Sequence, residues 1–347
     1  MSGAADAPAG VPAGTPTRVG VVSLGLIGGS VARRLAAHGL EVHAWNPSLP
    51  ALEAAAADGI VPATTVAELC AAEPDVLVLA PPLRAMADVA REVAAHVRGS
   101  TVVTDAGSVK GAVARVVRAA GLASRFVGAH PMAGTERAGY AASDPALLDG
   151  ARWALTLEDD TRLDAFLRVA ALVTGPLGGV VRVTTPAVHD AAVALVSHVP
   201  HVVASELLRL VGGSDVTDLA LALAAGSFRD GTRVAGTHPR RTEAMVTDNA
   251  TAVAPVLRRA AADLAALADA LEAGEPVGEF FDEAAAVRAG ARVAGPQDVR
   301  STLVLDDVTW RAALLSRPRA LVVGADVRGR TLTLTTPPPT TPPPADS

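Results

Sequence analysis

Short runs of β-branched residues alternate with helical patterns over the first half of the chain, and this alternation constrains the fold more than any other feature. We predict strands at 18–23, 41–45, 75–80, 101–104 and 126–129. Amphipathic helical patterns lie between them, at 27–38, 50–57, 65–71, 84–96 and 109–119. A helix around 161–173 follows, between two more strand-like runs at 151–158 and 179–185. This order predicts an α/β fold with a parallel sheet that is covered by helices on both faces.

The hydrophobic pattern changes after residue 185. Apolar residues recur there at three- and four-residue spacing until about 272, which indicates a mostly helical second domain. The tail TPPPTTPPPADS cannot pair in a sheet or continue a helix. We therefore divide the chain into a disordered N-terminus (1–17), an α/β domain (18–184), a helical domain (185–290), a small β appendage (291–335) and a disordered proline-rich tail (336–347).

The turn after the first predicted strand is similar to the dinucleotide fingerprint G-x-G-x-x-G, with a serine at the first position. The first glycine allows the tight turn, the second lets the backbone approach a pyrophosphate, and the third lets helix and strand pack closely. Ser23 fits the first position if its φ is negative. We predict a dinucleotide site at the helix N-terminus, formed by Ser23, Gly25, Leu26, Ile27 and Gly28. An ordinary glycine-rich turn is the alternative.

Asn46 stands at the end of the second predicted strand, where an acidic residue would select NAD. An asparagine can bond a ribose 2′-hydroxyl and does not repel a 2′-phosphate. The choice between NAD and NADP therefore stays open. Alternatively, Asn46 only begins an Asn-Pro turn.

Polar residues follow the later strands, where ligands bind in open α/β sheets. They are Asp105, Ser108 and the only lysine, Lys110, after the fourth strand, and His130 and Glu136 after the fifth; Pro81 ends the third strand. A histidine with a near-neutral pKa suits removal of a hydroxyl proton during hydride transfer. The alternatives are a structural histidine and a solvated lysine at a helix start.

Two clusters of polar residues in the helical domain are further candidate sites. Ser197, His198 and His201 lie in SHVPH, but no cysteine or third clear ligand is near, so we predict no metal site. Asp230 and Arg233 are three residues apart in FRDGTR, where the carboxylate could hold the guanidinium for an anionic substrate. A surface ion pair is the alternative.

Composition excludes several classes of partner. The net charge is −6 and there is no basic stripe, so we expect neither nucleic acid nor an anionic membrane surface as a partner. No uncharged apolar run reaches the length of a membrane span, and the N-terminus lacks the features of a signal peptide. The single cysteine, Cys70, excludes an internal disulfide framework and fits a reducing compartment, so we expect a cytoplasmic protein.

Five segments, LGLIGGS, DAGSVKG, GAHPMAGTERAG, SHVPH and SFRDGTRVAG, occur in this order over roughly residues 18–290. This set resembles the prephenate dehydrogenase family, which includes arogenate dehydrogenases. The resemblance implies a Rossmann-type nucleotide-binding domain followed by a mostly α-helical dimerisation domain, and a homodimer. It implies oxidative decarboxylation of prephenate to 4-hydroxyphenylpyruvate with NAD or NADP, in tyrosine biosynthesis.

The resemblance also assigns roles to residues. His130 takes the proton of the ring C4 hydroxyl and Ser108 orients it beside the nicotinamide. Arg233 binds the ring carboxylate and Asp230 positions Arg233. The remaining pocket residues are Thr135, Glu136, Ser197, His198 and His201, and the cofactor side includes Pro81, Asp105 and Lys110.

The chain departs from the family pattern at Ser23, at Asn46 and at Thr242, where many members carry a tryptophan. The residues after 290 are too few for a complete regulatory ACT domain. Three other functions stay open: an arogenate dehydrogenase, a 3-hydroxyacid dehydrogenase and a catalytically silent dinucleotide-binding regulator. The intact HPMAGTE and FRDGTR segments disfavour the second, and the retention of His130, Ser108 and Arg233 disfavours the third.

Overall fold

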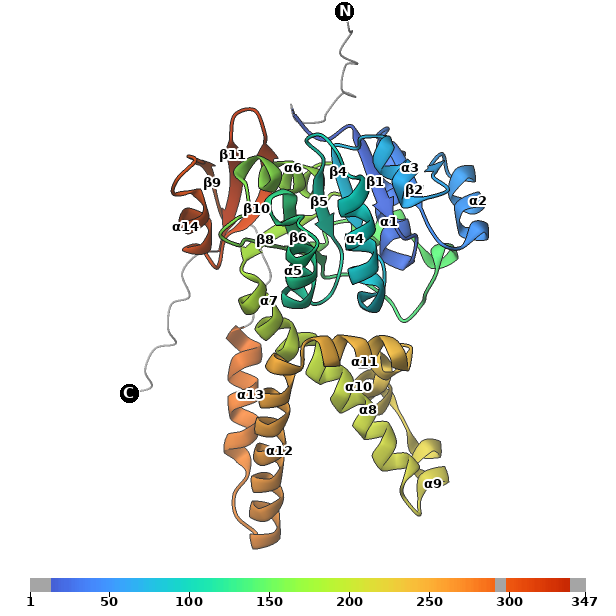
Figure 1. Ribbon diagram of the computed structural model, residues 1–347. Coiled ribbons are helices and arrows are strands. Elements are labelled where there is room, and N and C mark those ends of the chain that lie inside the picture. The colour runs from blue at the N-terminus through green and yellow to red at the C-terminus, as the bar shows by residue number, and fades with distance from the viewer. Residues whose placement is uncertain (1–13, 291–297, 338–347) are drawn as a thin grey trace, which may run out of the picture.

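The computed structural model describes residues 14–290 and 298–337, and Figure 1 shows an α/β part above two arms of helices. The expectations for 1–13, for 291–297 and for the tail after 337 lie outside these residues. The first half consists of β1 (Arg18–Val22), α1 (Leu26–Ala37), β2 (Glu41–Trp45), α2 (Leu49–Ala57), β3 (Val61–Pro62), α3 (Val66–Ala71), β4 (Val76–Leu79), η1 (Leu83–Ala85), α4 (Met86–His96), β5 (Val102–Asp105), α5 (Lys110–Ala119), η2 (Ala123–Arg125), β6 (Phe126–Pro131), η3 (Tyr140–Ala142), η4 (Pro145–Leu148), β7 (Arg152–Thr156), α6 (Leu163–Thr174) and β8 (Val180–Thr184).

Strand order in the sheet is β3-β2-β1-β4-β5-β6-β7-β8-β10-β11-β9. Strands β3 to β6 are parallel, in the order of a nucleotide-binding half-sheet, so the predicted fold class is confirmed. A fully parallel sheet is wrong, however, because β7 runs antiparallel to β6. The sequence shows a strand but not its direction, which depends on the path of the connecting loop.

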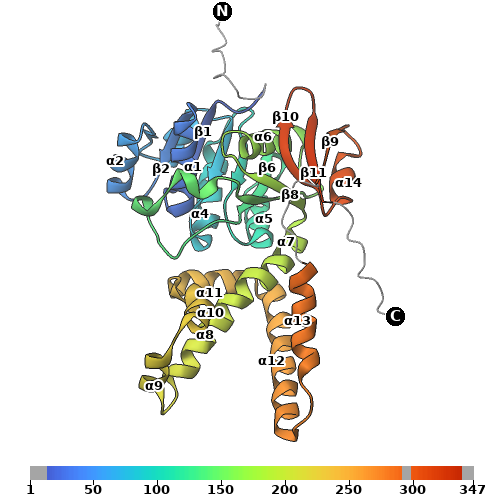
Figure 2. The same cartoon turned by 180° about the vertical axis from the view of Figure 1, so that it is seen from behind.

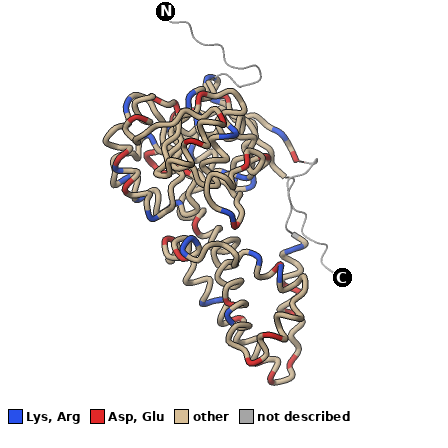
Figure 3. The backbone as a smooth tube through the Cα atoms, turned by 90° about the vertical axis from the view of Figure 1, so that its right-hand side faces the viewer, with Lys and Arg blue, Asp and Glu red and all other residues tan. Residues whose placement is uncertain are grey.

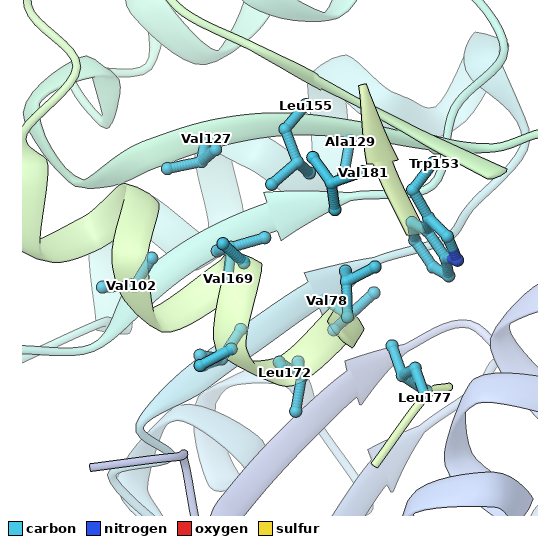
Figure 4. Close-up of a cluster of buried hydrophobic side chains, with 14 of the residues drawn as sticks. Val78, Val102, Val127, Ala129, Trp153, Leu155, Val169, Leu172, Leu177 and Val181 are labelled. Carbon is cyan, nitrogen blue, oxygen red and sulfur yellow. The ribbon is translucent and has the colours of Figure 1, made fainter. Parts of the chain in front are cut away.

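Apolar side chains fill both faces of this sheet. All four residues of β4 and of β5 are buried, as expected of strands covered by helices on both sides. Figure 4 shows Val78, Val102 and Val127 on the face that α6 covers, together with Val169 and Leu172 of that helix. Met86, Val89 and Val93 of α4 lie in the core of the opposite face.

The segment after the helical part returns to the first sheet. It contains β9 (Val299–Val304), α14 (Trp310–Leu315), β10 (Leu321–Asp326) and β11 (Thr331–Thr336). Strand β10 pairs antiparallel with β8, and Trp310 packs on Phe166 of α6 with ring centroids 5.3 Å apart. The last strands therefore extend the sheet of the α/β part, as Figure 2 shows from behind.

The helical part forms two arms that diverge below the sheet (Figures 1 and 2). Its elements are α7 (Pro186–Val193), the π-helical turn η5 (Ala194–His198), α8 (Val199–Gly212), α9 (Thr217–Leu223), α10 (Gly226–Thr232), η6 (Arg233–Gly236), α11 (Pro239–Asp248), α12 (Ala250–Ala273) and α13 (Gly278–Gly290). Figure 3 shows basic and acidic residues interspersed over both the α/β part and the helical arms.

The continuous helix from Pro186 to Gly212 carries much exposed apolar surface. By length and composition it could cross a membrane, although only 28% of its most apolar window is buried inside the chain. Val203, Leu207 and Leu210 form an exposed stripe on α8 at four- and three-residue spacing. Contiguous exposed apolar surface of this kind is typical of a protein–protein or membrane interaction site.

Candidate active site

The glycine-rich turn has the geometry of a dinucleotide site, although Ser23 does not have the backbone conformation that we expected. Ser23 has a φ of +79°, not the negative value that we expected for a serine. This left-handed conformation costs a residue with a Cβ roughly 1–2 kcal/mol. Two hydrogen bonds hold the turn: Ser23 donates its N–H to the Trp45 carbonyl at 2.8 Å, and Leu24 donates its N–H to Asn46.

The two retained glycines have different environments. A Cβ on Gly28 would lie 2.0 Å from the Ser23 carbonyl oxygen, so only glycine permits this contact between helix and strand. A Cβ on Gly25 would meet nothing within 4 Å, and no side chain caps the N-terminus of α1. Gly25 therefore leaves room beside free backbone N–H groups, which is what a pyrophosphate requires.

The Asn46 side chain forms hydrogen bonds within the protein. Its Oδ1 accepts the Leu24 N–H at 2.9 Å, and its amide nitrogen donates to the Ser48 carbonyl at 3.4 Å. This side chain thus ties the end of β2 to the glycine-rich turn. It brings no charge to the ribose position.

A cavity of about 510 Å³ opens beyond the carboxyl ends of β1, β4, β5 and β6. Seven of the predicted site residues line it: Ser23, Gly25, Leu26, Ile27, Pro81, Ser108 and His130. The helical part closes one side with His238, Arg240, Arg241 and Ala244. The cavity therefore joins the phosphate-binding turn to the predicted proton acceptor, as a dehydrogenase site requires.

His130 is held by a chain of hydrogen bonds that the sequence did not reveal. Its Nδ1 lies 2.9 Å from Nε2 of His189, and Nδ1 of His189 lies 2.8 Å from Oδ1 of Asp190. The Asp190 carboxylate also accepts the backbone N–H groups of Lys110 at 2.7 Å and Gly111 at 2.8 Å, at the N-terminus of α5. Among the residues described, no hydrogen bond joins Ser108 to His130, so His189 takes the orienting place that we expected for Ser108.

The Asp190 carboxylate determines which ring nitrogens of His189 and His130 carry a proton. Burial alone would raise the pKa of Asp190, but the hydrogen bonds from His189, Lys110 and Gly111 lower it overall. An ionised Asp190 accepts a hydrogen bond from the Nδ1–H of His189, which leaves Nε2 of His189 as an acceptor. His130 must then carry its own proton on Nδ1, so its Nε2 is free to accept another.

Burial also keeps His130 neutral. Its pKa is lowered well below the usual value, first by burial and then by the charges of Lys110, His189 and His198. A neutral imidazole with a free Nε2 is a proton acceptor across the neutral pH range.

Asp105 and Lys110 lie beneath the cavity rather than in its wall, contrary to their predicted contact with the cofactor. Both are buried and form an ion pair, and Nζ of Lys110 also donates to the Ala129 carbonyl at 2.6 Å. Oδ1 of Asp105 accepts the Ala129 N–H at 2.9 Å. This pair joins the ends of β5 and β6 and so positions His130, the residue after Ala129.

Of the SHVPH cluster, His198 is the most enclosed. Its Nδ1 lies 3.0 Å from the amide nitrogen of Asn249, and its buried Nε2 has no hydrogen-bond partner among the residues described. Burial lowers its pKa to about 4, although the charge of Asp190 opposes the shift. His201 bonds the Ser197 carbonyl, and neither residue lines the cavity.

The predicted substrate residues Thr135, Glu136, Asp230 and Arg233 do not line the cavity of a single chain. All four are exposed, and in 14–290 and 298–337 no ion pair joins Asp230 to Arg233. Whether these four residues contact a substrate therefore depends on which molecule packs against the helical part.

Basic residues that we did not predict line the cavity instead: Arg84, Arg137, His238, Arg240 and Arg241. Nη1 of Arg241 donates to the Thr135 carbonyl at 3.3 Å and so links α11 to the loop after β6. The THPRR segment, with three basic side chains at a helix start, is a signal that could have drawn attention to His238, Arg240 and Arg241. In the described ranges no group of three His, Cys, Asp or Glu residues is placed to hold a metal.

Two family models match the chain in succession. Residues 31–183 match the nucleotide-binding domain of prephenate dehydrogenase, and residues 185–282 match its dimerisation domain. Together they account for well over half of the chain. The chain belongs to the prephenate dehydrogenase family.

Individual members of the prephenate dehydrogenase family agree with this assignment. Cyclohexadienyl dehydrogenase of Zymomonas mobilis is 32% identical over 280 residues, which cover 78% of this chain and 94% of that protein. Prephenate dehydrogenase of Aquifex aeolicus, solved with hydroxyphenyl propionate and NAD⁺, is 29% identical with a TM-score of 0.72, over 79% and 98% of the two chains. Arogenate dehydrogenase of Synechocystis is 28% identical with a TM-score of 0.69, over 79% and 99%.

The matched lengths end before the last strands. The dimerisation model stops at residue 282, so β9, α14, β10 and β11 lie outside both family models. The chain is an NAD(P)-dependent oxidoreductase of this family, and its additional C-terminal strands are joined to the nucleotide-binding sheet.

Proposed function

We propose that the protein oxidises and decarboxylates prephenate to 4-hydroxyphenylpyruvate, with arogenate as the alternative substrate. The observation that carries the proposal is the chain His130–His189–Asp190, which ends at a cavity shared with the dinucleotide turn. A catalytically silent relative would not need a histidine whose proton acceptor faces the cofactor cavity.

The chemistry follows from this placement. A dinucleotide held at the turn of Gly25 and the N-terminus of α1 would supply the acceptor for the hydride of ring C4. Nε2 of His130 accepts the proton of the C4 hydroxyl, and the resulting imidazolium is stabilised through His189 by the Asp190 carboxylate. The C1 carboxylate leaves as CO₂ and the ring becomes aromatic, which makes the reaction irreversible in practice.

Arginines on two sides of the cavity suit a substrate with two carboxylates. Arg240 and Arg241 reach the cavity from α11, and Arg137 reaches it from the loop after β6. Guanidinium groups bind carboxylates with paired hydrogen bonds. We assign Arg137, Arg240 and Arg241 of one chain to one of the two substrate carboxylates. We assign Arg233 to the other, the ring carboxylate, once a second copy of the chain covers the helical part.

The cofactor is NAD or NADP, and we favour NAD. The cradle fits a dinucleotide because Gly25 leaves open space at an uncapped helix N-terminus. The neutral Asn46 neither repels nor attracts a 2′-phosphate, and the Aquifex aeolicus relative was solved with NAD⁺. Asn46→Asp should shift preference towards NAD by repelling the 2′-phosphate.

We further propose a cytoplasmic homodimer that pairs through the helical part. The matched dimerisation model and the exposed apolar stripe on α8 support the dimer. A second copy of the chain would cover the exposed apolar surface of the helix from Pro186 to Gly212. The buried thiol of Cys70 fits a reducing compartment.

The deciding experiment is absorbance at 340 nm with prephenate or arogenate, each offered with NAD and with NADP. We expect rapid reduction with one substrate. His130→Asn should lower kcat roughly 10²–10⁴-fold with little change in cofactor affinity. No reduction in any combination, with cofactor binding intact, would refute the proposed activity.

A further inference from the structure

The loop of residues 132–139, between β6 and η3, forms one wall of the cofactor cavity. Four of its residues line that cavity: Ala133, Arg137, Ala138 and Gly139. At its start, Met132 donates its backbone N–H to the Arg152 carbonyl of β7 at 2.7 Å. None of the loop residues is buried, so core packing does not determine where this wall stands.

Tyr140, the only tyrosine of the chain, directly follows this loop and is buried. Its hydroxyl donates to Oδ2 of Asp58 at 2.6 Å, and the Arg33 guanidinium lies over its ring, 4.3 Å from the centroid. Nε of Arg33 donates to the same Asp58 oxygen at 2.8 Å. The side chains of Arg33, Asp58 and Tyr140, which we call the tyrosine anchor, thus join the end of the loop to α1 and to the residue after α2.

The end of the loop is also packed on the backbone of α1. A Cβ on Gly29 would lie 2.8 Å from the Tyr140 ring, so the ring and the helix are in direct contact. Nη1 of Arg33 donates to the Ser143 carbonyl at 2.7 Å. Helix α1 is the helix whose uncapped N-terminus faces the open space beside Gly25. The tyrosine anchor therefore fixes one wall of the cavity relative to the dinucleotide turn.

The hydrogen bond from Tyr140 to Asp58 joins a protonated phenol to an ionised carboxylate. The pKa of Tyr140 is raised to about 12, first by burial and then by the hydrogen bond to Asp58. The pKa of Asp58 is lowered, first by the hydrogen bond from Tyr140. Such a charge-assisted hydrogen bond is stronger than one between neutral groups. The anchor therefore persists across the neutral pH range.

We propose that Tyr140 is a positioning residue for substrate binding, because its hydrogen bond to Asp58 holds the loop of residues 132–139 where Arg137 reaches a substrate carboxylate. The three anchor side chains do not line the cofactor cavity, and the proposed reaction gives them no chemical role. Gly139, with a φ of +84°, joins the loop to Tyr140 and permits a change of direction there once the anchor is lost. The anchoring of the loop is independent of the substrate, whereas its effect on KM rests on the proposed function.

The anchoring is tested on the full chain without substrate, by the initial rate of trypsin cleavage after Arg137, measured from fragment masses. Tyr140→Phe removes the hydroxyl and keeps the ring, and Asp58→Ala removes its acceptor. We expect faster cleavage after Arg137 in both variants, because a less anchored loop enters the protease more readily. Thr174→Val is the matched control, since it removes a hydroxyl hydrogen bond within α6, and it should leave this rate unchanged.

The effect on substrate binding is tested by steady-state kinetics of the same variants. In Tyr140→Phe and Asp58→Ala the substrate KM should rise about tenfold. Both should change kcat by less than about threefold, since the hydrogen bonds of His130 are untouched. Cofactor affinity should stay unchanged. The double variant should be no worse than Asp58→Ala alone, because both substitutions remove the same hydrogen bond.

Three results would overturn the inference. The first is a cleavage rate and a KM that are both unchanged in the two variants. The second is faster cleavage with an unchanged KM, which would refute the effect of the loop on substrate binding. The third is a joint loss of thermal stability, cofactor affinity and kcat, which would make Tyr140 merely structural. Because cleavage needs no substrate, a protein that oxidised neither prephenate nor arogenate would still test the anchor, so the two failures are distinguishable.

Discussion

A proton acceptor works only if its free nitrogen faces the substrate, and in this chain Asp190 determines which nitrogen of His130 is free. The carboxylate lies two hydrogen bonds away from His130, at the N-terminus of α5. His130 stands out in the sequence beyond a strand, but nothing in the sequence links it to His189, 59 positions later. The arrangement makes Asp190 a positioning residue, because it acts through His189.

We expect Asp190→Asn to lower kcat roughly 10²–10⁴-fold, because an amide can present an N–H to His189 and so favour the wrong tautomer along the chain. Cofactor affinity should stay close to that of the unmodified protein, since Asp190 does not line the cofactor cavity. Steady-state kinetics and cofactor titration separate the two effects. A fall in stability alone, with kcat restored at lower temperature, would make the role merely structural.

The pH profile of kcat/KM tests the neutral state of His130 directly. Burial lowers the pKa of His130 well below 6.5, so the free base persists as pH falls and is lost only when pH reaches the depressed pKa. We therefore expect the acid limb of kcat/KM to lie below pH 6.5. An acid limb at or above pH 6.5 would contradict this environment for His130.

At the scale of elements, the turn between β1 and α1 shows two glycines with different physical roles. Gly28 lets the helix approach the strand, whereas Gly25 leaves space for a ligand. Serine at position 23 is tolerated because hydrogen bonds from the β1–α1 turn to the end of β2 hold the left-handed conformation.

Two alanine substitutions should separate these roles. Gly28→Ala forces a Cβ against the Ser23 carbonyl and should cost roughly 3 kcal/mol in the free energy of unfolding. Gly25→Ala has open space, so unfolding should change by less than about 1 kcal/mol, while dinucleotide affinity falls about tenfold or more. Denaturant unfolding and cofactor titration measure both. Equal effects of the two substitutions on stability would show that Gly25 is also a packing residue.

At the scale of the whole molecule, the chain leaves the α/β part after β8, builds the helical arms and returns to the same sheet through β10. The cofactor cavity lies at the junction of these parts. The exposed stripe Val203, Leu207 and Leu210 lies in the part of the chain that matches the dimerisation domain of the family.

A charge on that stripe should dissociate the proposed dimer. We expect Leu210→Glu to shift the mass measured by light scattering after size exclusion from two chains towards one, because the carboxylate would be buried without a partner. Leu49→Glu, on an equally exposed leucine of the α/β part, serves as control and should keep the dimer. A dimer that survives Leu210→Glu would exclude α8 from the interface.

Hydrophobic period and glycine spacing are local properties, so the residues alone were enough to predict most helices and strands of the α/β part, the fold class and the position of the dinucleotide turn. It also located His130 and Ser108 beyond the strand ends. The antiparallel direction of β7, the burial of Lys110 with Asp105, the return of the last strands to the sheet and the partner of His130 became visible in the three-dimensional fold alone. These depend on which distant segments meet, and contacts between segments far apart in the chain leave no periodic trace in the residues that make them.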